Sequence, residues 1–149
     1  MIFILAVLAV FLLDQGTKWL VMRNMEIGES IPIISNVFHL TYVRNPGAAF
    51  GMLAYKTTFF IVITVLVVVA IAWYYRKIPD NRRWLKLGLI LQVGGAIGNL
   101  VDRIRFGRVI DFFDFRVWPV FNIADIAIVV GVGLLFLEVI RRDDRPTVE

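Results

Sequence analysis

The run TTFFIVITVLVVVAIAWYY, residues 57–75, decides the fold class. It carries no charged residue, and a helical rise of about 1.5 Å per residue makes it long enough to cross a hydrocarbon core of about 30 Å. Trp73, Tyr74 and Tyr75 close the run, and these side chains favour the boundary between lipid and water. We therefore predict a transmembrane helix over Thr57–Tyr75.

The whole chain has the composition of a polytopic membrane protein. Of its 149 residues 59% are hydrophobic and the mean hydropathy is +0.77, which is too apolar for a soluble domain of this length. We expect one membrane-embedded domain over residues 1–149. The net charge of +4 does not indicate a nucleic acid partner, because most basic residues flank apolar runs, where they face lipid head groups.

Three further transmembrane helices are predicted on either side of the first run. They cover residues 2–22, 85–101 and 121–140. The first of these lacks a basic leader and a small-x-small cleavage site, and more spans follow it, so we interpret it as an uncleaved helix and not a signal peptide. Gly94 and Gly98 have the small-xxx-small spacing that lets helix backbones approach closely.

The connectors that leave the membrane differ in character. Val37–Val43 is β-branched and aromatic, which favours a strand, and Gly28, Pro32 and Asn36 mark turns around it. Residues 104–119 are rich in aromatic side chains and suit a connector that lies in the membrane interface. The expected fold is therefore all-α and polytopic, with four transmembrane helices and a small extramembrane β-rich region between helices one and two.

The distribution of basic residues predicts the orientation. They crowd the loop between the second and third spans and the tail after the fourth, namely Arg76, Lys77, Arg82, Arg83, Lys86, Arg141, Arg142 and Arg145. By the positive-inside rule this loop, this tail and both termini are cytoplasmic. The outer connectors also carry basic residues, so the two sides differ in the density of positive charge and not in its total.

With this orientation, polar residues from several segments converge on the outer leaflet. They are Asp14, Asn45, Asn99, Arg103, Asp111, Asn122 and Asp125, and we expect them to surround one cavity. Polar groups kept at membrane depth cost free energy, so they indicate a functional site. Asp125 stands out, because it lies inside an apolar helix with Asn122 one turn earlier on the same face.

Structural roles are an alternative for several of these residues. Asp14 and Lys18 are four residues apart, which suits an interfacial ion pair on one helical face. Asn45, with the proline and glycine after it, also fits an ordinary turn. For Asp102 and Asp114 we favour a helix cap or a partner for a nearby arginine, Arg103 or Arg116.

The residue types restrict the available chemistry. The chain has no cysteine, which excludes disulfides, thiol catalysis and cysteine-bound metal, and His39, its only histidine, is interpreted as a loop residue. No metal or other cofactor is expected. Two carboxylates brought close share a proton, so one can activate water while the other donates to a substrate amide. This chemistry is aspartyl amide hydrolysis.

Two non-enzymatic alternatives remain at this point. In a small transporter Asp14, Asp111 and Asp125 would form a proton relay, but a relay needs polar groups through the bilayer and these are concentrated at one end of the spans. An assembly scaffold would explain Gly94 and Gly98 but not the carboxylates.

The chain resembles the lipoprotein signal peptidase (signal peptidase II) family over nearly its whole length. The matching pieces are Asp14-Gln15-x-x-Lys18, Arg44-Asn45-Pro46-Gly47-Ala48-Ala49-Phe50, residues 94–103 (GGAIGNLVDR), Val109-Ile110-Asp111-Phe112 and Phe121-Asn122-Ile123-Ala124-Asp125. Their order along the chain is that of the family. Two small departures are Ile110, where the family often has valine, and a short connector between Asp111 and Asp125.

The resemblance implies an aspartic endopeptidase with Asp111 and Asp125 as its catalytic dyad. Residues implied to bind substrate or support the site are Asp14, Lys18, Asn45, Gly47, Asn99, Arg103 and Asn122. The implied substrate is a prolipoprotein whose cysteine carries diacylglycerol, cut on the amino side of that cysteine. The resemblance also implies membrane lipid as a partner, the bacterial cytoplasmic (inner) membrane as location, and inhibition by cyclic lipopeptides of the globomycin type.

Overall fold

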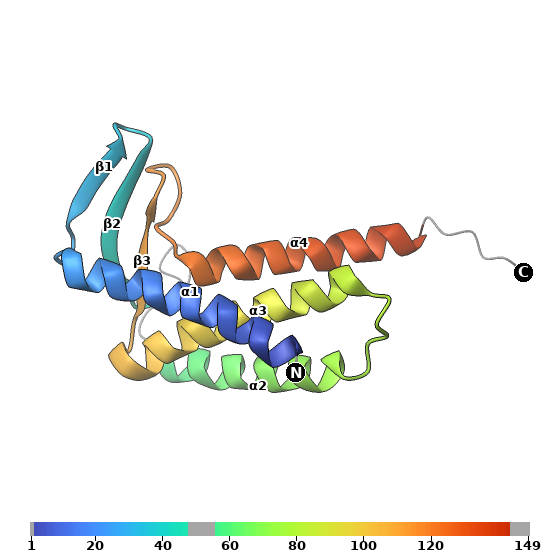
Figure 1. The fold of residues 1–149 in the computed structure, drawn as a ribbon. Coiled ribbons are helices and arrows are strands. Elements are labelled where there is room, and N and C mark those ends of the chain that lie inside the picture. Colours follow the sequence, from blue (N-terminus) through green and yellow to red (C-terminus); the bar gives the residue numbers. More distant parts are fainter. Residues whose placement is uncertain (1, 48–55, 144–149) are drawn as a thin grey trace, which may run out of the picture.

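The computed structural model describes residues 2–47 and 56–143 of the chain (Figure 1). Its elements in order are α1 (Ile2–Asn24), β1 (Ser30–Ile34), β2 (Phe38–Asn45), α2 (Thr57–Tyr75), α3 (Arg83–Phe106), β3 (Val109–Asp114) and α4 (Ile123–Asp143). All four helices are long and apolar enough to span a membrane, which confirms the predicted spans. The predicted bounds of α2 match those observed.

Helix α3 runs further than predicted, beyond Val101 to Phe106. It ends at Gly107, which adopts the left-handed conformation (φ 69°) and donates its backbone N–H to the carbonyl of Arg103 over 2.9 Å. Glycine accepts this conformation without strain, which makes it a common helix terminator. The extension keeps Arg103 in regular helix and holds it at the end of the bundle.

Helix α3 is the centre of the bundle and packs against α1, α2 and α4. Gly94 and Gly98 face α1, where an added Cβ would lie 2.6 Å from Val10 Cβ and 2.3 Å from Asp14 Oδ2. Gly95 faces α4, where an added Cβ would lie 2.4 Å from the backbone oxygen of Ala124. The predicted close approach of helices at Gly94 and Gly98 is therefore present, and Gly95 extends it to a second helix.

The strands form one antiparallel sheet in the order β1-β2-β3. Figure 1 shows it at one end of the bundle, with its strands running across the helix direction. β2 corresponds to the predicted strand, and Gly28 and Asn36 lie in turns with positive φ. Pro32 was wrongly predicted as a turn residue, since it lies in β1, an edge strand in which proline is tolerated.

The third strand corrects the predicted extent of the β-rich region. β3 comes from the connector between α3 and α4, which was predicted to lie in the interface, and it pairs with β2 through Val43 opposite Asp111 and Asn45 opposite Val109. Its inner face packs with Tyr42 and Val21 in a core that contains Ile110 and Phe112. This core fixes β3 against the end of α1 and brings Asp111 to the bundle.

Candidate active site

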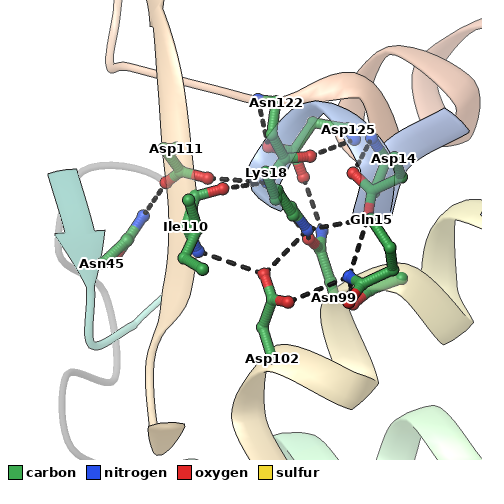
Figure 2. A network of polar contacts seen from close by, with 12 residues as sticks. Asp14, Gln15, Lys18, Asn45, Asn99, Asp102, Ile110, Asp111, Asn122 and Asp125 are labelled. Carbon is green, nitrogen blue, oxygen red and sulfur yellow. Dashed lines mark hydrogen bonds and ion pairs between the residues drawn. The ribbon is translucent and has the colours of Figure 1, made fainter. Parts of the chain in front are cut away.

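Asp111 on β3 and Asp125 in the first turn of α4 line one cavity of about 260 Å³ at the sheet end of the bundle. The other predicted site residues on its wall are Asn45, Gly47, Asn99 and Arg103. The remaining predicted residues, Asp14, Lys18 and Asn122, are buried behind this wall (Figure 2). The predicted residues thus lie in one region, but Asp14 and Asn122, which were predicted to surround the cavity, are not on its wall.

Asp111 is held by neutral amides. Asn45 Nδ2 donates to its Oδ2 over 3.0 Å, and Asn122 Nδ2 donates to its Oδ1 over 2.7 Å (Figure 2). Its residue surface is only 2% exposed. Burial, followed by repulsion from the Asp125 carboxylate, raises the pKa of Asp111 to about 7. Near neutral pH this carboxyl can therefore hold or release a proton.

Asp125 is half-buried and is fixed by two asparagines. Asn99 Nδ2 donates to its Oδ1 over 2.8 Å. The backbone N–H of Asn122 donates to its Oδ2 over 3.2 Å, while the backbone N–H of Asp125 donates to Asn122 Oδ1 over 3.0 Å. This reciprocal cap begins α4 and orients the carboxylate toward the cavity.

Asn45 combines the two roles considered for it. Its Oδ1 accepts the backbone N–H of Gly47 over 3.0 Å, which makes a turn, while its Nδ2 holds Asp111. Arg103 donates to the Gly47 carbonyl over 3.4 Å, and its guanidinium lies 4.8 Å from the ring centre of Phe60. Ala48, Ala49 and Phe50, which complete this motif, lie outside the described residues.

Behind the cavity, Lys18 joins two carboxylates in a buried cluster. Its Nζ lies 2.9 Å from Asp14 Oδ2 and 2.8 Å from Asp102 Oδ2, and it donates to Asn99 Oδ1 over 2.9 Å (Figure 2). The predicted pairing of Asp14 with Lys18 is present, but it is buried and not interfacial. For Asp102 the predicted arginine partner was wrong, because α1 supplies Lys18 to this position.

Asp114 has the predicted arginine partner. Arg116 donates its backbone N–H to Asp114 Oδ1 over 2.8 Å and its Nη1 lies 3.1 Å from Oδ2. Burial alone would raise the pKa of Asp114, but the hydrogen bonds from Thr41 and Arg116 and the arginine charge outweigh it, so this pKa is lowered. Asp114 lies at the far end of β3, opposite His39, and is not on the cavity wall.

The sequence interpretation quoted Gln15 in a family motif but gave it no role in the site. Its Nε2 donates to Asp102 Oδ1 over 3.0 Å and to the carbonyl of Gly98 over 3.2 Å, which links α1 to α3. An amide inside an apolar helix, between Asp14 and Lys18, was the signal that could have identified it.

The interpretation of His39 as a loop residue was wrong, and the strand predicted over Val37–Val43 gives its position correctly. His39 lies in β2, with Nδ1 3.1 Å from Ser30 Oγ. Over residues 2–47 and 56–143, no group of three or more His, Asp or Glu side chains is arranged to hold a metal ion. The chemistry that the described cavity offers is that of its paired carboxylates.

Comparison with known proteins identifies the family. Residues 6–141 match the family described as signal peptidase (SPase) II. The chain belongs to the signal peptidase II family. It is 54% identical to the lipoprotein signal peptidase of Moorella thermoacetica over 133 residues, which cover 89% of each chain. It is 55% identical to that of Halothermothrix orenii over 134 residues, which cover 89% of this chain and 91% of the relative.

A solved structure supports the same assignment. A bacterial membrane enzyme, determined by the in meso method at 2.3 Å resolution, matches with a TM-score of 0.92 and 32% identity, over 99% of this chain and 92% of that chain. The resemblance noted in the sequence is thus confirmed. The protein is a multi-pass membrane protease of the aspartic type that processes lipoproteins.

Proposed function

We propose that Asp111 and Asp125 are the catalytic dyad of this signal peptidase II. The observation that carries the proposal is their placement: two carboxylates from separate elements line one cavity, and Asn122 contacts both. The raised pKa of Asp111 agrees with a pair that shares one proton at neutral pH.

In the proposed mechanism Asp125 accepts a proton from water while Asp111 donates its proton to the scissile carbonyl oxygen. The water oxygen bonds to the carbonyl carbon and gives a tetrahedral intermediate. Collapse of the intermediate breaks the carbon–nitrogen bond. The leaving amine takes the proton that water gave to Asp125, and a hydroxyl of the intermediate returns its proton to Asp111 as the new carboxyl group forms. The amides of Asn45, Asn99 and Asn122 orient both carboxylates without adding charge.

The proposed substrate is a prolipoprotein with a diacylglyceryl-modified cysteine, cut on the amino side of that cysteine. An apolar groove of about 370 Å³ supports this proposal. It is lined by Trp118, Phe121, Asp125, Ile126, Val129 and Val130. Four of these residues, Trp118, Phe121, Asp125 and Val129, also line the catalytic cavity. Val129 is 69% exposed on the outer face of α4, so a lipid-anchored chain can reach Asp125 from the side.

We further propose that the protein lies in the bacterial cytoplasmic (inner) membrane, with both termini cytoplasmic and the cavity near the outer leaflet. The basic loop between α2 and α3 is at the opposite end of the bundle from the sheet (Figure 1), as the positive-inside rule requires for this orientation. Cyclic lipopeptides of the globomycin type are proposed to inhibit by occupying the cavity and the groove together.

The test is cleavage of a diacylglyceryl-modified precursor peptide by the purified protein in detergent micelles. We expect cleavage before the modified cysteine, and a much lower rate with the same peptide unmodified. Asp111→Asn and Asp125→Asn should each abolish turnover, and the double variant should be hardly slower than either, because one mechanism is lost only once. Substantial turnover by a folded Asp111→Asn or Asp125→Asn variant would exclude this dyad.

A proton relay was the alternative that the sequence left open for Asp14, Asp111 and Asp125, and the family match weighs against it. The relay predicts no cleavage of either peptide, so the experiment separates the two functions directly. The described helix α2 has no buried residue, and the buried polar side chains gather at the sheet end of α1, α3 and α4. This distribution favours a site at one membrane surface over a path across the bilayer.

A further inference from the structure

The residue that precedes each dyad aspartate is held by a buried carboxylate. The backbone N–H of Ile110, before Asp111, donates to Asp102 Oδ2 over 3.1 Å. The backbone N–H of Ala124, before Asp125, donates to Asp14 Oδ1 over 2.9 Å. Both Ile110 and Ala124 are 0% exposed, so water does not compete for these bonds.

At Ile110, side-chain hydrogen bonds take the place of those that a neighbouring strand would make. β3 is at the edge of the described three-stranded sheet. Asp102 accepts the N–H of Ile110, and the backbone carbonyl of Ile110 accepts from Asn122 Nδ2 over 3.1 Å. Side chains from α3 and from the start of α4 thus bond the backbone of β3 directly beside Asp111.

At Ala124 the carboxylate of Asp14 acts as a cap supplied by another helix. The first N–H groups of a helix have no partner within it, and a negative charge at this end is favourable. The position of α4 along its own axis, and with it that of Asp125, is thereby tied to α1. Gly98 leaves the space for this carboxylate, since an added Cβ would lie 2.3 Å from Asp14 Oδ2.

Lys18 connects the two holding carboxylates. Its Nζ contacts Asp14 Oδ2 and Asp102 Oδ2 at 2.9 and 2.8 Å, and the opposite oxygen of Asp14 holds Ala124. Lys18, Asp14 and Asp102 are each at most 1% exposed. One ammonium thus offsets buried charge on two carboxylates, and each carboxylate still bonds one backbone N–H.

We propose that Asp14, Lys18 and Asp102 form a positioning unit that sets the separation of the two catalytic carboxylates. Asp102 fixes Asp111 through the backbone of Ile110. Asp14 fixes Asp125 through the backbone of Ala124. Lys18 keeps the two carboxylates, Asp14 and Asp102, at a fixed separation by contacting both. The inference rests on the proposed dyad. None of the three acts on substrate; each acts through the backbone next to a catalytic aspartate.

The test compares two replacements of Asp102 that separate its hydrogen bond from its charge. Asp102→Asn keeps an acceptor oxygen at the same reach for Ile110 but loses the charge that faces Lys18. Asp102→Glu keeps the charge but moves the acceptor by one methylene group. Positioning predicts a higher kcat per folded enzyme for Asn than for Glu. An ion pair that only stabilises the fold predicts equal kcat per folded enzyme and a higher unfolding temperature for Glu.

The readouts are kcat and KM per folded enzyme on the diacylglyceryl-modified peptide, with the folded fraction taken from thermal unfolding. We expect kcat of Asp102→Glu to be at least about tenfold below that of Asp102→Asn, with KM within about threefold, since a displacement near 1 Å can cost about a hundredfold in rate. If Asp102→Glu does not fold, Asp102→Ala replaces it, because alanine removes the acceptor without adding volume, and the same order is expected.

Asp114→Glu is the matched control. Asp114 also accepts a backbone N–H and pairs with an arginine, but it contacts neither dyad aspartate nor its preceding residue. We expect its kcat to stay within about twofold of the unchanged protein. Equal kcat for the Asn and Glu variants at Asp102, the reverse order, or an equal loss in Asp114→Glu would overturn the positioning unit.

Parallel measurements on Asp111→Asn and Asp125→Asn keep the two proposals apart. If either retains turnover, the dyad itself is wrong. If both are inactive and the order at Asp102 is reversed, the dyad stands and only the positioning unit fails.

Discussion

Asn122 and Asp125 cap each other at the start of α4, each accepting the other's backbone N–H, over 3.0 Å at Asn122 Oδ1 and 3.2 Å at Asp125 Oδ2. The same Asn122 side chain donates to Asp111 over 2.7 Å. One fully buried asparagine therefore begins the helix that carries one aspartate of the proposed dyad and holds the carboxylate of the other.

These two roles of Asn122 can be separated by substitution. Asn122→Ser keeps an oxygen that can cap α4 but loses the amide that donates to Asp111, whereas Asn122→Ala loses both. We expect serine to retain most of the cap's stability, about 1 kcal/mol relative to alanine. Both variants should lose at least about tenfold in kcat, because the Asp111 carboxylate loses one of the two amide donors that orient it. Thermal unfolding and kcat on the lipidated peptide measure the two effects. Full activity in the serine variant would contradict the role given to the amide.

The pH dependence of kcat should report the proton on Asp111. Burial and the neighbouring Asp125 carboxylate raise the pKa of Asp111 to about 7, so its protonated form prevails below this pH and its charged form above it. A dyad that needs one shared proton loses it as the pH rises through about 7, and kcat should fall on that side. The profile is measured at saturating substrate between about pH 5 and pH 9. A rate that stays constant up to the alkaline end would show that Asp111 does not hold the required proton.

The Lys18→Met variant tests whether the pH dependence of kcat reports Asp111. The positive charge of Lys18 is among the causes that lower the pKa of Asp111. Removing the charge by Lys18→Met favours the protonated carboxyl, so the alkaline fall should move to higher pH. A shift to lower pH would contradict the assignment of this limb to Asp111.

Much of the fold could be predicted because it depends on local composition. The uninterrupted Val and Ile run gave the bounds of α2, and the β-branched residues of Val37–Val43 gave the position of β2. β3 could not be found in this way. Its phenylalanines suit an interfacial segment equally well, and its strand pairs with residues such as Val43, far away in the chain.

In the candidate site, too, some features could be predicted from local sequence and others depend on tertiary packing. Asp111 and Asp125 were predicted as the dyad from the family motifs, and the cost of a carboxylate in an apolar helix also pointed to Asp125. The contact of Lys18 with Asp102 depends on how α1 packs against α3, which no spacing within either segment encodes. Arg103, the neighbour of Asp102 in sequence, instead lines the cavity, where it lies over Phe60.

The contact between Gly95 and Ala124 should limit the size of the side chain that position 95 of α3 accepts. In Gly95→Ala the new Cβ would lie 2.4 Å from the backbone oxygen of Ala124, which cannot rotate away, so α4 has to move. We expect a loss of about 1–3 kcal/mol in the free energy of unfolding, as for other overpacked positions. Gly133→Ala is the control, since nothing lies within 4 Å of the added Cβ, and it should be neutral or slightly stabilising. Thermal unfolding in detergent compares them, and equal stability of the two variants would contradict the tight α3–α4 contact.

The proposed orientation can be tested on a chain that contains no cysteine of its own. Asn81→Cys places a thiol in the exposed basic loop between α2 and α3, and Val117→Cys places one at a residue that is 91% exposed between β3 and α4. The dense positive charge around Asn81 should keep that loop in the cytoplasm. A membrane-impermeant maleimide added to intact spheroplasts should therefore label Val117→Cys at once and Asn81→Cys only after permeabilisation.

Both variants should retain cleavage, because neither residue contacts the dyad. Labelling of Asn81→Cys alone in intact cells would invert the proposed topology and move the cavity to the cytoplasmic face.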